Sequence, residues 1–387
     1  MNRQRRSDLL GKVLVRESFL VVLVLVLWGP TLSLRHAFGQ ASKPTSQNEW
    51  QNMLEAAKQE GKLVVSIPPS TELRKGIGEA FSKRFGLSIE LVPARGATLI
   101  SRIVDESKAG VRYFDLHIGG TESIVKGFLP EGAVAPLAPL LVLPEVKEAK
   151  NWWGGHVWMD NAKRFIYSFA AYQTESLWHN TSLVKPEEFR SFDDLLNPKW
   201  QAKIGISDPR TPGSGASMWS YMRAIKGEGF LKSFVGQKLY ITRDLRLLAE
   251  NTAKAQLGIA VGIAYAEFLP FLKAGLPVKP LPQPKEGMYA TTGYGSMTLI
   301  RNAPHPNAAK LFVNWFLGKD GQEIYTTSMG EPTRRMDVDT TWLKKTGISA
   351  AKDIMSIEEF YKRENQSEEK IYQVRDPGAE LARKLLD

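Results

Sequence analysis

Residues 202–222, AKIGISDPRTPGSGASMWSYM, place a buried strand, a turn and a helix in immediate succession. Ile204 and Ile206 alternate with small residues, and an Asp-Pro pair ends the strand. Apolar residues then recur at helical spacing over 216–226, up to a break at Gly227. A strand followed directly by a helix is the repeating unit of α/β folds, so this stretch predicts an α/β protein.

Small residues fill the turn between this strand and this helix. Gly213, Ser214 and Gly215 would let a ligand approach the free N–H groups at the helix N-terminus. That end of a helix carries roughly half a positive charge and therefore favours an anion. We expect an anion site at Ser214, Gly215 and Ala216, with Arg210 nearby in sequence. The alternative is structural, with Gly213 making the turn and a serine capping the helix.

The composition is that of an ordinary soluble protein. The chain has 387 residues, is 43% hydrophobic and carries a net charge of +10. This length suggests two domains, or two lobes of one domain. Residues 1–39 hold six Lys/Arg and two Asp/Glu, which leaves a surplus of only +6 on the rest. Without a five-residue basic run or an aromatic RNA-binding signature, we expect no nucleic-acid partner.

Residues 1–39 resemble a secretory signal peptide, because basic residues precede an apolar run at 19–28 that Gly29-Pro30 ends. Cleavage is expected after Gly39 or Ala41. The run is shorter than the roughly 20 residues of a transmembrane helix, and an uncleaved anchor is the alternative. The chain has no cysteine, so neither a disulfide nor a lipidated cysteine can form. We expect a protein free in the periplasm.

The first part of the mature chain alternates helices and strands. Buried strands are predicted at 63–67, 88–92 and 114–118, with helices between them. Right-handed crossovers make the three strands parallel and bring the loops that follow them to one edge of the sheet, where α/β proteins bind ligands. The candidate binding residues at this edge are Ser70, Thr71, Arg95, Gly120 and Thr121. For Arg95 the alternative is a solvated turn residue.

A second α/β unit follows, and the chain then returns to the first. The unit has further strands at 257–263 and 278–281, and the polar turn 291–295 precedes a returning strand at 296–300. Tyr265 and Tyr294 join the candidate ligand-binding residues. The predicted boundaries are 46–165 and 288–335 for lobe 1, 166–287 for lobe 2, and 336–387 for a C-terminal helical segment that packs on the lobes.

Motifs of several enzyme classes are missing. The sequence contains no Gly-x-x-x-x-Gly-Lys-Ser/Thr phosphate loop and no His-Glu-x-x-His. The surroundings of Ser214 lack both glycines of a Gly-x-Ser-x-Gly nucleophile elbow, and no histidine has the context of a catalytic base. We therefore expect a binding protein without catalytic residues, cofactor or bound metal. A secreted enzyme is the alternative.

Several ordered motifs resemble one family across residues 50–334. They are AAKQEGKLVV at 56–65, ARG at 94–96, LNPKWQAKI at 196–204, DPR at 208–210, APHPNAAKLF at 303–312 and GQ at 321–322. Together they resemble the periplasmic solute-binding proteins of ABC importers, in the type II group that includes the ferric-ion-binding proteins. The resemblance implies a two-lobed type II periplasmic-binding-protein fold, in which each lobe is a mainly parallel sheet flanked by helices. It also implies a ligand cleft between the lobes and an ABC permease of the inner membrane as partner. We expect a monomer.

The same resemblance bears on the ligand. Ferric-binding relatives use a histidine, a glutamate and a tyrosine pair, and the matching positions here are Ser70, Gly120 and Ala264-Tyr265. One phenolate is too few for Fe³⁺, so we expect a small anionic organic solute, with ferric ion as the alternative. Tyr265 would then contribute a hydroxyl or ring face, or simply pack at its helix start.

Closure on this ligand is expected to be a hinge motion near 165–172 and 286–295. An anion that touches both Arg95 and Arg210 would stabilise the closed state, because it contacts both side chains only when the lobes are closed. Gly215→Asp is expected to harm binding far more than folding, because it places a negative charge in the site.

Overall fold

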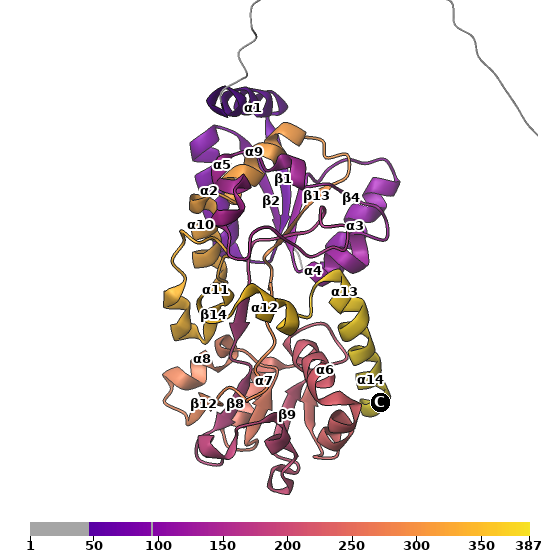
Figure 1. The fold of residues 1–387 in the computed structure, drawn as a ribbon, viewed down its shortest axis with the longest axis vertical. Helices are drawn as coiled ribbons and strands as arrows, with labels where there is room; N and C mark the ends of the chain where they lie inside the picture. Colours follow the sequence, from indigo (N-terminus) through magenta and orange to yellow (C-terminus); the bar gives the residue numbers. More distant parts are fainter. Residues whose placement is uncertain (1–45, 94–95) are drawn as a thin grey trace, which may run out of the picture. The chain divides into compact units, whose positions relative to one another are not determined.

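The computed structural model describes residues 46–93 and 96–387. The predicted signal segment and the 94–95 part of the ARG motif lie outside these residues. Within the described ranges, no helix is both long and apolar enough to span a membrane. The strands form a seven-stranded, a five-stranded and a two-stranded sheet. We call the larger sheet with its helices lobe 1, and the five-stranded sheet with its helices lobe 2 (Figure 1).

Lobe 1 contains the three parallel strands that the sequence predicts. The sheet order is β2 (Ser88–Pro93), β1 (Lys62–Ile67), β3 (Leu116–Gly119), β13 (Ser296–Ile300), β6 (Tyr167–Ser168) and β5 (Val157–Trp158), with β4 (Val134–Ala135) also paired to β13. Strand β1 runs parallel to both β2 and β3, as predicted. The returning strand β13 is antiparallel to β3, which confirms that the chain comes back to this sheet.

Helices cover both faces of this sheet, because successive side chains of a strand point to opposite faces. Leu63 and Val65 of β1 belong to one buried cluster, and Val64 belongs to the other. The helices of lobe 1 are α1 (Ser46–Glu60), α2 (Thr71–Phe85), α3 (Gly96–Lys108), α4 (Thr121–Ser123), η1 (Ile124–Phe128), η2 (Ala138–Leu140), α5 (Pro144–Lys147), η3 (Ala149–Asn151), α9 (Pro306–Phe316) and α10 (Lys319–Met329).

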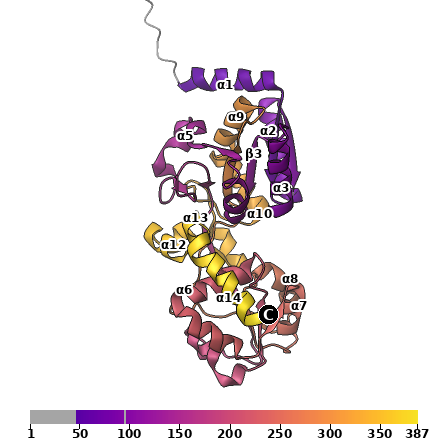
Figure 2. The same cartoon turned by 90° about the vertical axis from the view of Figure 1, so that its right-hand side faces the viewer.

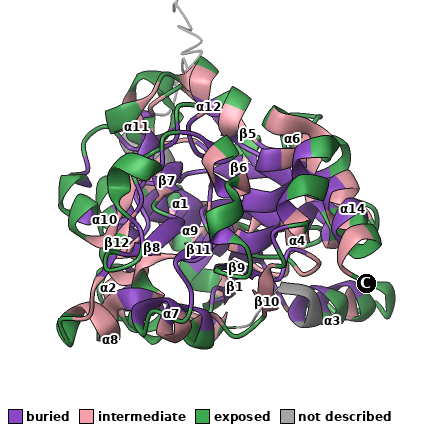
Figure 3. Ribbon diagram, turned by 90° about the horizontal axis from the view of Figure 1, so that it is seen from below, coloured by how far each residue is buried: buried purple, intermediate pink, exposed green. Residues whose placement is uncertain are grey.

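Lobe 2 is built around the strand-turn-helix stretch. Its sheet order is β10 (Tyr240–Thr242), β9 (Ile204–Ser207), β11 (Ile259–Val261), β8 (Leu177–Asn180) and β12 (Val278–Pro280). Strand β9 lies between two parallel neighbours, β10 and β11, and is fully buried (Figure 3). The helices are η4 (Pro186–Glu188), η5 (Phe192–Leu196), η6 (Pro198–Trp200), α6 (Ser214–Val235), α7 (Leu245–Ala253) and α8 (Tyr265–Lys273).

Helix α6 agrees with the sequence at its break and differs at its end. Gly227 has φ 81° and ψ 174°, so the helical path is interrupted where predicted. A second helical stretch continues beyond it to Val235. This continuation, β10 and α7 were not predicted, because their short apolar patterns are weak against the surrounding polar residues.

Two segments connect the lobes, and they pair with each other. Strand β7 (Tyr172–Thr174) leaves lobe 1 after β6, and Tyr172 exchanges both backbone hydrogen bonds with Thr291 on the returning segment, at 2.9 and 2.8 Å. The expected boundary at 165–166 is too early, because β6 pairs with β13 inside the lobe 1 sheet. The expected hinge positions stay a prediction, and the paired segments overlap them.

The C-terminal segment touches both lobes. After η7 (Thr341–Thr346), strand β14 (Ile348–Ala350) pairs with β7. The remaining helices are α11 (Ala351–Ile354), α12 (Ile357–Arg363), α13 (Glu368–Lys370), η8 (Ile371–Arg375) and α14 (Asp376–Leu386). Ile371 is buried in a lobe 1 cluster, and Leu381 is buried in a lobe 2 cluster. Helix α14 runs along α6 (Figure 2).

Candidate functional site

The start of α6 lies at the edge of lobe 2 where its parallel strands end. The Ser214 hydroxyl donates to the backbone carbonyl of Gly262, which follows β11, at 2.6 Å. No side chain caps the helix, and no acceptor in the described part of the chain pairs with the backbone N–H of Ser214, Gly215 or Ala216. Gly215 and Ala216 are buried. Buried N–H groups are nearly always paired, so this edge offers donors suited to an anion from outside the protein.

Gly215 is required by packing, which corrects one expectation. A Cβ atom at this position would lie 2.2 Å from the Ser207 carbonyl oxygen at the end of β9. Gly262 packs against the same turn, where an added Cβ would lie 2.7 Å from the Gly215 Cα. Gly215→Asp would therefore damage folding directly, and the expectation that it mainly harms binding is wrong.

Arg210 does not point into a free site. Its guanidinium donates to both carboxylate oxygens of Asp208, at 2.8 and 3.1 Å, and to Asp387 at 2.6 Å. Asp208 is 4% exposed. Burial would raise the pKa of this carboxyl, but hydrogen bonds from Arg210 and Arg243 outweigh burial and lower the pKa to about 2. Arg210 thus stabilises the turn after β9, and its expected contact with a ligand stays a prediction that would require it to leave these partners.

Tyr265 begins α8 directly after the β11 turn. Its ring centroid lies 6.0 Å from that of Trp178, and the side chain is partly buried against the cluster around Trp178. The packing alternative for this residue therefore has direct support. Because the turn at Gly262 contacts Ser214, the start of α8 also lies close to the start of α6.

At the matching edge of lobe 1, Ser70 and Thr71 begin α2. The Ser70 hydroxyl accepts a hydrogen bond from the Leu73 N–H at 3.1 Å and is the N-cap of the helix. Thr71 is exposed at the first helical position. The Ser70 hydroxyl is therefore engaged in capping. Arg95 lies outside the described residues.

Gly120 and Thr121 follow β3 and contact the polar turn 291–295. The Thr121 hydroxyl is fully buried and hydrogen-bonds to the hydroxyls of Thr292, at 3.2 Å, and Ser296, at 2.7 Å. A Cβ on Gly120 would lie 3.8 Å from the Gly293 carbonyl oxygen. Thr121 is thus internal to lobe 1, which corrects its expected place on the binding surface.

Tyr294 lies at the tip of this turn with its side chain 42% exposed. Its backbone N–H donates to Glu331 at 2.9 Å. Glu331 also accepts from the Tyr325 hydroxyl and is buried. Burial raises the pKa of Glu331 despite these donors. The turn is therefore fixed by its backbone, which leaves the Tyr294 ring on the surface.

The residue that joins the two edges was missed by the sequence analysis. Arg375, at the end of η8, is 5% exposed. Its guanidinium donates to the Ser217 hydroxyl in the first turns of α6 and to Glu122 of lobe 1 at 2.7 Å. Glu122 directly follows Thr121, and Ser217 directly follows Ala216. No local signal marks Arg375, since 158 residues separate it from Ser217.

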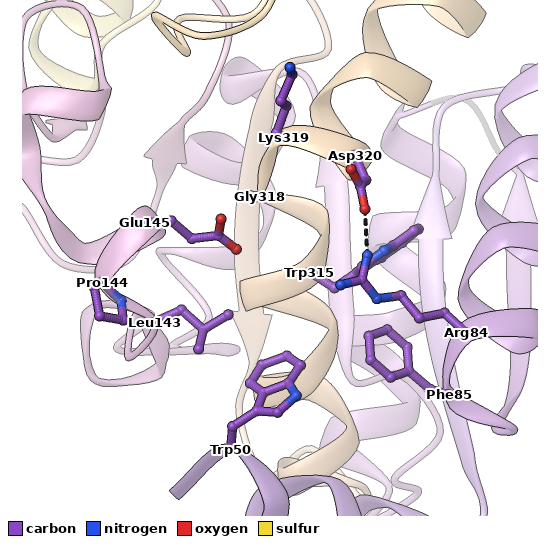
Figure 4. Close-up of a pocket in the computed structure, with 10 residues that line it drawn as sticks. All are labelled: Trp50, Arg84, Phe85, Leu143, Pro144, Glu145, Trp315, Gly318, Lys319 and Asp320. Carbon is purple, nitrogen blue, oxygen red and sulfur yellow. Dashed lines mark hydrogen bonds and ion pairs between the residues drawn. The ribbon is translucent and has the colours of Figure 1, made fainter. Parts of the chain in front are cut away.

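A separate cavity of about 560 Å³ lies in lobe 1, between the α2 C-terminus, the α9–α10 junction and the start of α5 (Figure 4). Trp50, Phe85 and Trp315 line it beside the Arg84–Asp320 ion pair. Helix α2 begins at the strand-end edge and finishes at this cavity, so the cavity belongs to a different part of the lobe. Among the described residues, no cluster of three or more His, Cys, Asp or Glu side chains is placed to hold a metal.

Comparisons with known proteins found a matching family model, a sequence relative and similar solved structures. A family model described as bacterial extracellular solute-binding protein matches residues 62–328. An uncharacterized protein of Haemophilus influenzae is 24% identical over 289 residues, which cover 70% of this chain and 76% of that protein. Among solved structures, Trichodesmium FutA (IdiA) in complex with iron and citrate has a TM-score of 0.64 at 17% identity, covering 84% of this chain and 99% of its own. AfuA of Actinobacillus pleuropneumoniae, with exogenous fructose-6-phosphate bound, has a TM-score of 0.56 at 16% identity with the same coverage.

Proposed function

Because the chain belongs to the bacterial extracellular solute-binding proteins, we propose that it captures a small anionic organic solute between its lobes and delivers it to an ABC permease. Its fold is the predicted type II periplasmic-binding-protein fold, shared with iron-binding relatives. We further propose that residues 1–39 direct export and that the mature protein acts in the periplasm as a monomer without catalytic activity.

One observation carries the choice of an anion: Gly215 and Ala216 are buried at the start of α6, and their backbone N–H groups have no acceptor among residues 46–93 and 96–387. A helix N-terminus contributes about 0.3–2 kcal/mol to holding a negative charge, and a charge-assisted hydrogen bond contributes roughly 1.5–3 kcal/mol. Arg375 donates to the Ser217 hydroxyl in the first turns of the same helix, so a buried positive charge lies beside these groups. In this proposal the charge of Arg375 favours an anion at the helix start while its guanidinium stays bonded to Ser217 and Glu122.

Ligands of the structural relatives fit this chemistry. Citrate in the FutA complex and fructose-6-phosphate in the AfuA complex both carry anionic oxygens. These likenesses are under 20% identical, so they support a chemical class rather than a compound. The site residues proposed for the solute are Ser214, Gly215, Ala216, Tyr265 and Arg375, with Tyr294 and Gly120 from lobe 1.

Ferric ion remains the alternative cargo because iron-bound proteins share the fold. Tyr265 is the single phenol that the resemblance brings to the matching position, and its ring packs near Trp178. We expect no tight iron binding. Addition of ferric citrate to the protein would produce a visible tyrosinate-to-iron charge-transfer band if this expectation is wrong.

The proposal is tested by native mass spectrometry of the purified protein, followed by a thermal-shift screen of organic acids, phosphonates, amino acids, polyamines and sugars. We expect an anionic compound to raise the melting temperature. Stabilisation by polyamines or neutral sugars, with no effect from any anion, would refute the anion site.

A matched pair of variants then locates the site. Ser214→Asp places a negative charge at the first helical position, where the helix itself tolerates an acid. Ser214→Asn has nearly the same shape without the charge, and both variants remove the hydroxyl that bonds to Gly262. We expect Ser214→Asp to weaken the anion found in the screen about tenfold or more relative to Ser214→Asn. Equal affinities would place the anion elsewhere.

A further inference from the structure

Residues 364–387, which we call the strap, form a third connection between the lobes. Residues 368–371 of the strap are fixed to lobe 1, whereas the Asn365 amide before them donates to the Ser217 carbonyl of lobe 2 at 3.0 Å. Glu368 donates its backbone N–H to Met159 at 2.7 Å and accepts from Asn161 at 2.7 Å, and Ile371 is fully buried in a lobe 1 cluster. Residues 368–371 therefore move with lobe 1.

The part after η8 is fixed to lobe 2. The Trp219 indole of α6 donates to the Gly378 carbonyl at 2.9 Å, and Leu381 packs into the lobe 2 core. A Cβ on Gly378 would lie 2.5 Å from the Ser220 hydroxyl, so α14 and α6 are in close contact. Asp387 accepts from Arg210 at 2.6 Å. This half of the strap therefore moves with lobe 2.

The two halves meet at η8, which has π-helical hydrogen bonding over Ile371–Arg375. Such turns are rare, and they often occur at functional positions within helices. Any change in the angle between the lobes must bend the strap between Ile371 and Leu381, because each is anchored in a different core. The joint of the strap is therefore η8.

Arg375 is the last residue of this joint and holds both lobes. It donates to Glu122 of lobe 1 at 2.7 Å and to Ser217 of lobe 2. Neighbouring Lys126 pairs with Asp376, but the lysine side chain is 41% exposed and water weakens that pair. The Arg375 side chain is 5% exposed, and Glu122 is 23% exposed. The Arg375–Glu122 pair is therefore better shielded from water than the Lys126–Asp376 pair.

We propose that Arg375 is an interlobe latch and that η8 is the joint about which the strap bends when the lobes separate. Opening breaks the Arg375–Glu122 bond while α14 stays on α6. The latch holds the lobes together without any ligand, so it can be tested independently of the solute.

The test measures the interlobe distance by double electron–electron resonance in the absence of ligand. The chain has no cysteine, so Lys75→Cys on α2 and Arg246→Cys on α7 provide two unique spin-label sites on exposed positions. In this background, Glu122→Gln removes the charge of the lobe 1 partner and keeps its shape. Lys126→Gln is the comparison, because it removes the exposed pairs of Lys126 with Asp376 and with Glu122 and leaves the Arg375–Glu122 bond in place.

We expect the parent protein to show mainly one short distance. Glu122→Gln should raise the ratio of long to short distances about tenfold, as for loss of one charge-assisted hydrogen bond, while Lys126→Gln should change it less than twofold. Ser217→Ala removes the hydroxyl that accepts from Arg375 on the lobe 2 side and should also increase the long-distance population. This variant replaces Glu122→Gln if Glu122→Gln loses its folded circular-dichroism spectrum. A parent already dominated by long distances, or latch variants indistinguishable from Lys126→Gln, would overturn the proposal.

Discussion

The strand-end edges of the two lobes use their polar groups differently. At the lobe 1 edge, the Ser70 hydroxyl caps α2 and the Thr121 hydroxyl bonds to Thr292 and Ser296. At the lobe 2 edge, the hydroxyl of Ser214 pairs with Gly262, but no acceptor among the described residues pairs with the backbone N–H groups of Gly215 and Ala216. Polar side chains at such an edge can all be engaged in holding the fold. The unsatisfied backbone of lobe 2 is the better indicator of a binding surface.

The largest expected effect tests how rigidly the lobe 2 edge is packed. Gly215→Ala should lower the free energy of unfolding by about 3 kcal/mol, or prevent folding, because overpacking against backbone has no easy relief. The added Cβ would lie 2.2 Å from the Ser207 carbonyl oxygen. Chemical denaturation of the purified variant measures the change.

Gly229→Ala is the control on the same helix. No atom lies within 4 Å of the Cβ that it adds, so we expect a gain of about 0.5–1 kcal/mol from the lower entropy of the unfolded chain. If Gly215→Ala were as stable as Gly229→Ala, the close contact between α6 and β9 would be absent in solution.

A smaller effect separates the two arginines near α6. Arg210→Ala should lower the free energy of unfolding at pH 7 by about 1.5–3 kcal/mol, because buried Asp208 loses charge-assisted hydrogen bonds. The native pKa of Asp208 is about 2, below its ordinary value of 3.8. Its contribution is therefore present above pH 3.8 and is lost as the pH falls toward 2.

Urea denaturation between pH 3 and pH 7 checks this loss. Arg243→Ala should have a smaller effect, since the Arg243 side chain is 70% exposed. Solute affinity should be unchanged in Arg210→Ala. If Arg210→Ala kept full stability but lost solute binding, Arg210 would be a ligand-binding residue, which would contradict the structural role described above.

The sequence predicted the parts of the fold that rest on local patterns. Gly86 ends α2 in a left-handed conformation with φ 68°, and Gly227 interrupts α6, because both glycines act within one turn of the chain. The parallel direction of β1, β2 and β3 was predicted from their crossover connections and is confirmed. The strap was expected only as helices packing on the lobes, since nothing local indicates that Ile371 and Leu381 enter different cores.

The site was less predictable, because most of its contacts join residues that are far apart in the sequence. The turn at 213–216 was predicted because its small residues are typical of the start of a helix. The Asp208–Arg210 pair is also local, but whether an arginine meets a ligand or a neighbouring carboxylate depends on side-chain rotamers. Arg375 reaches the edge from the far end of the chain, and only the packing of α14 on α6 places it there.

The smallest expected effect concerns the lobe 1 turn that carries Tyr294. Burial raises the pKa of Glu331, so the native state binds a proton more readily than the unfolded chain, and the carboxyl group favours folding increasingly as the pH falls through its native pKa. Glu331→Gln resembles the protonated form and should stay within about 1 kcal/mol of the parent at pH 7. Any advantage of the variant should shrink as the pH falls through the raised native pKa, because the parent then takes up its proton. Denaturation curves from pH 7 downward measure the difference, with the same substitution at exposed Glu323 as the control. If the free energy of unfolding of the parent instead rises above that of Glu331→Gln as the pH increases toward 7, the ionised carboxylate of Glu331 stabilises the fold. The lobe 1 edge, like the lobe 2 edge, would then depend on a charge.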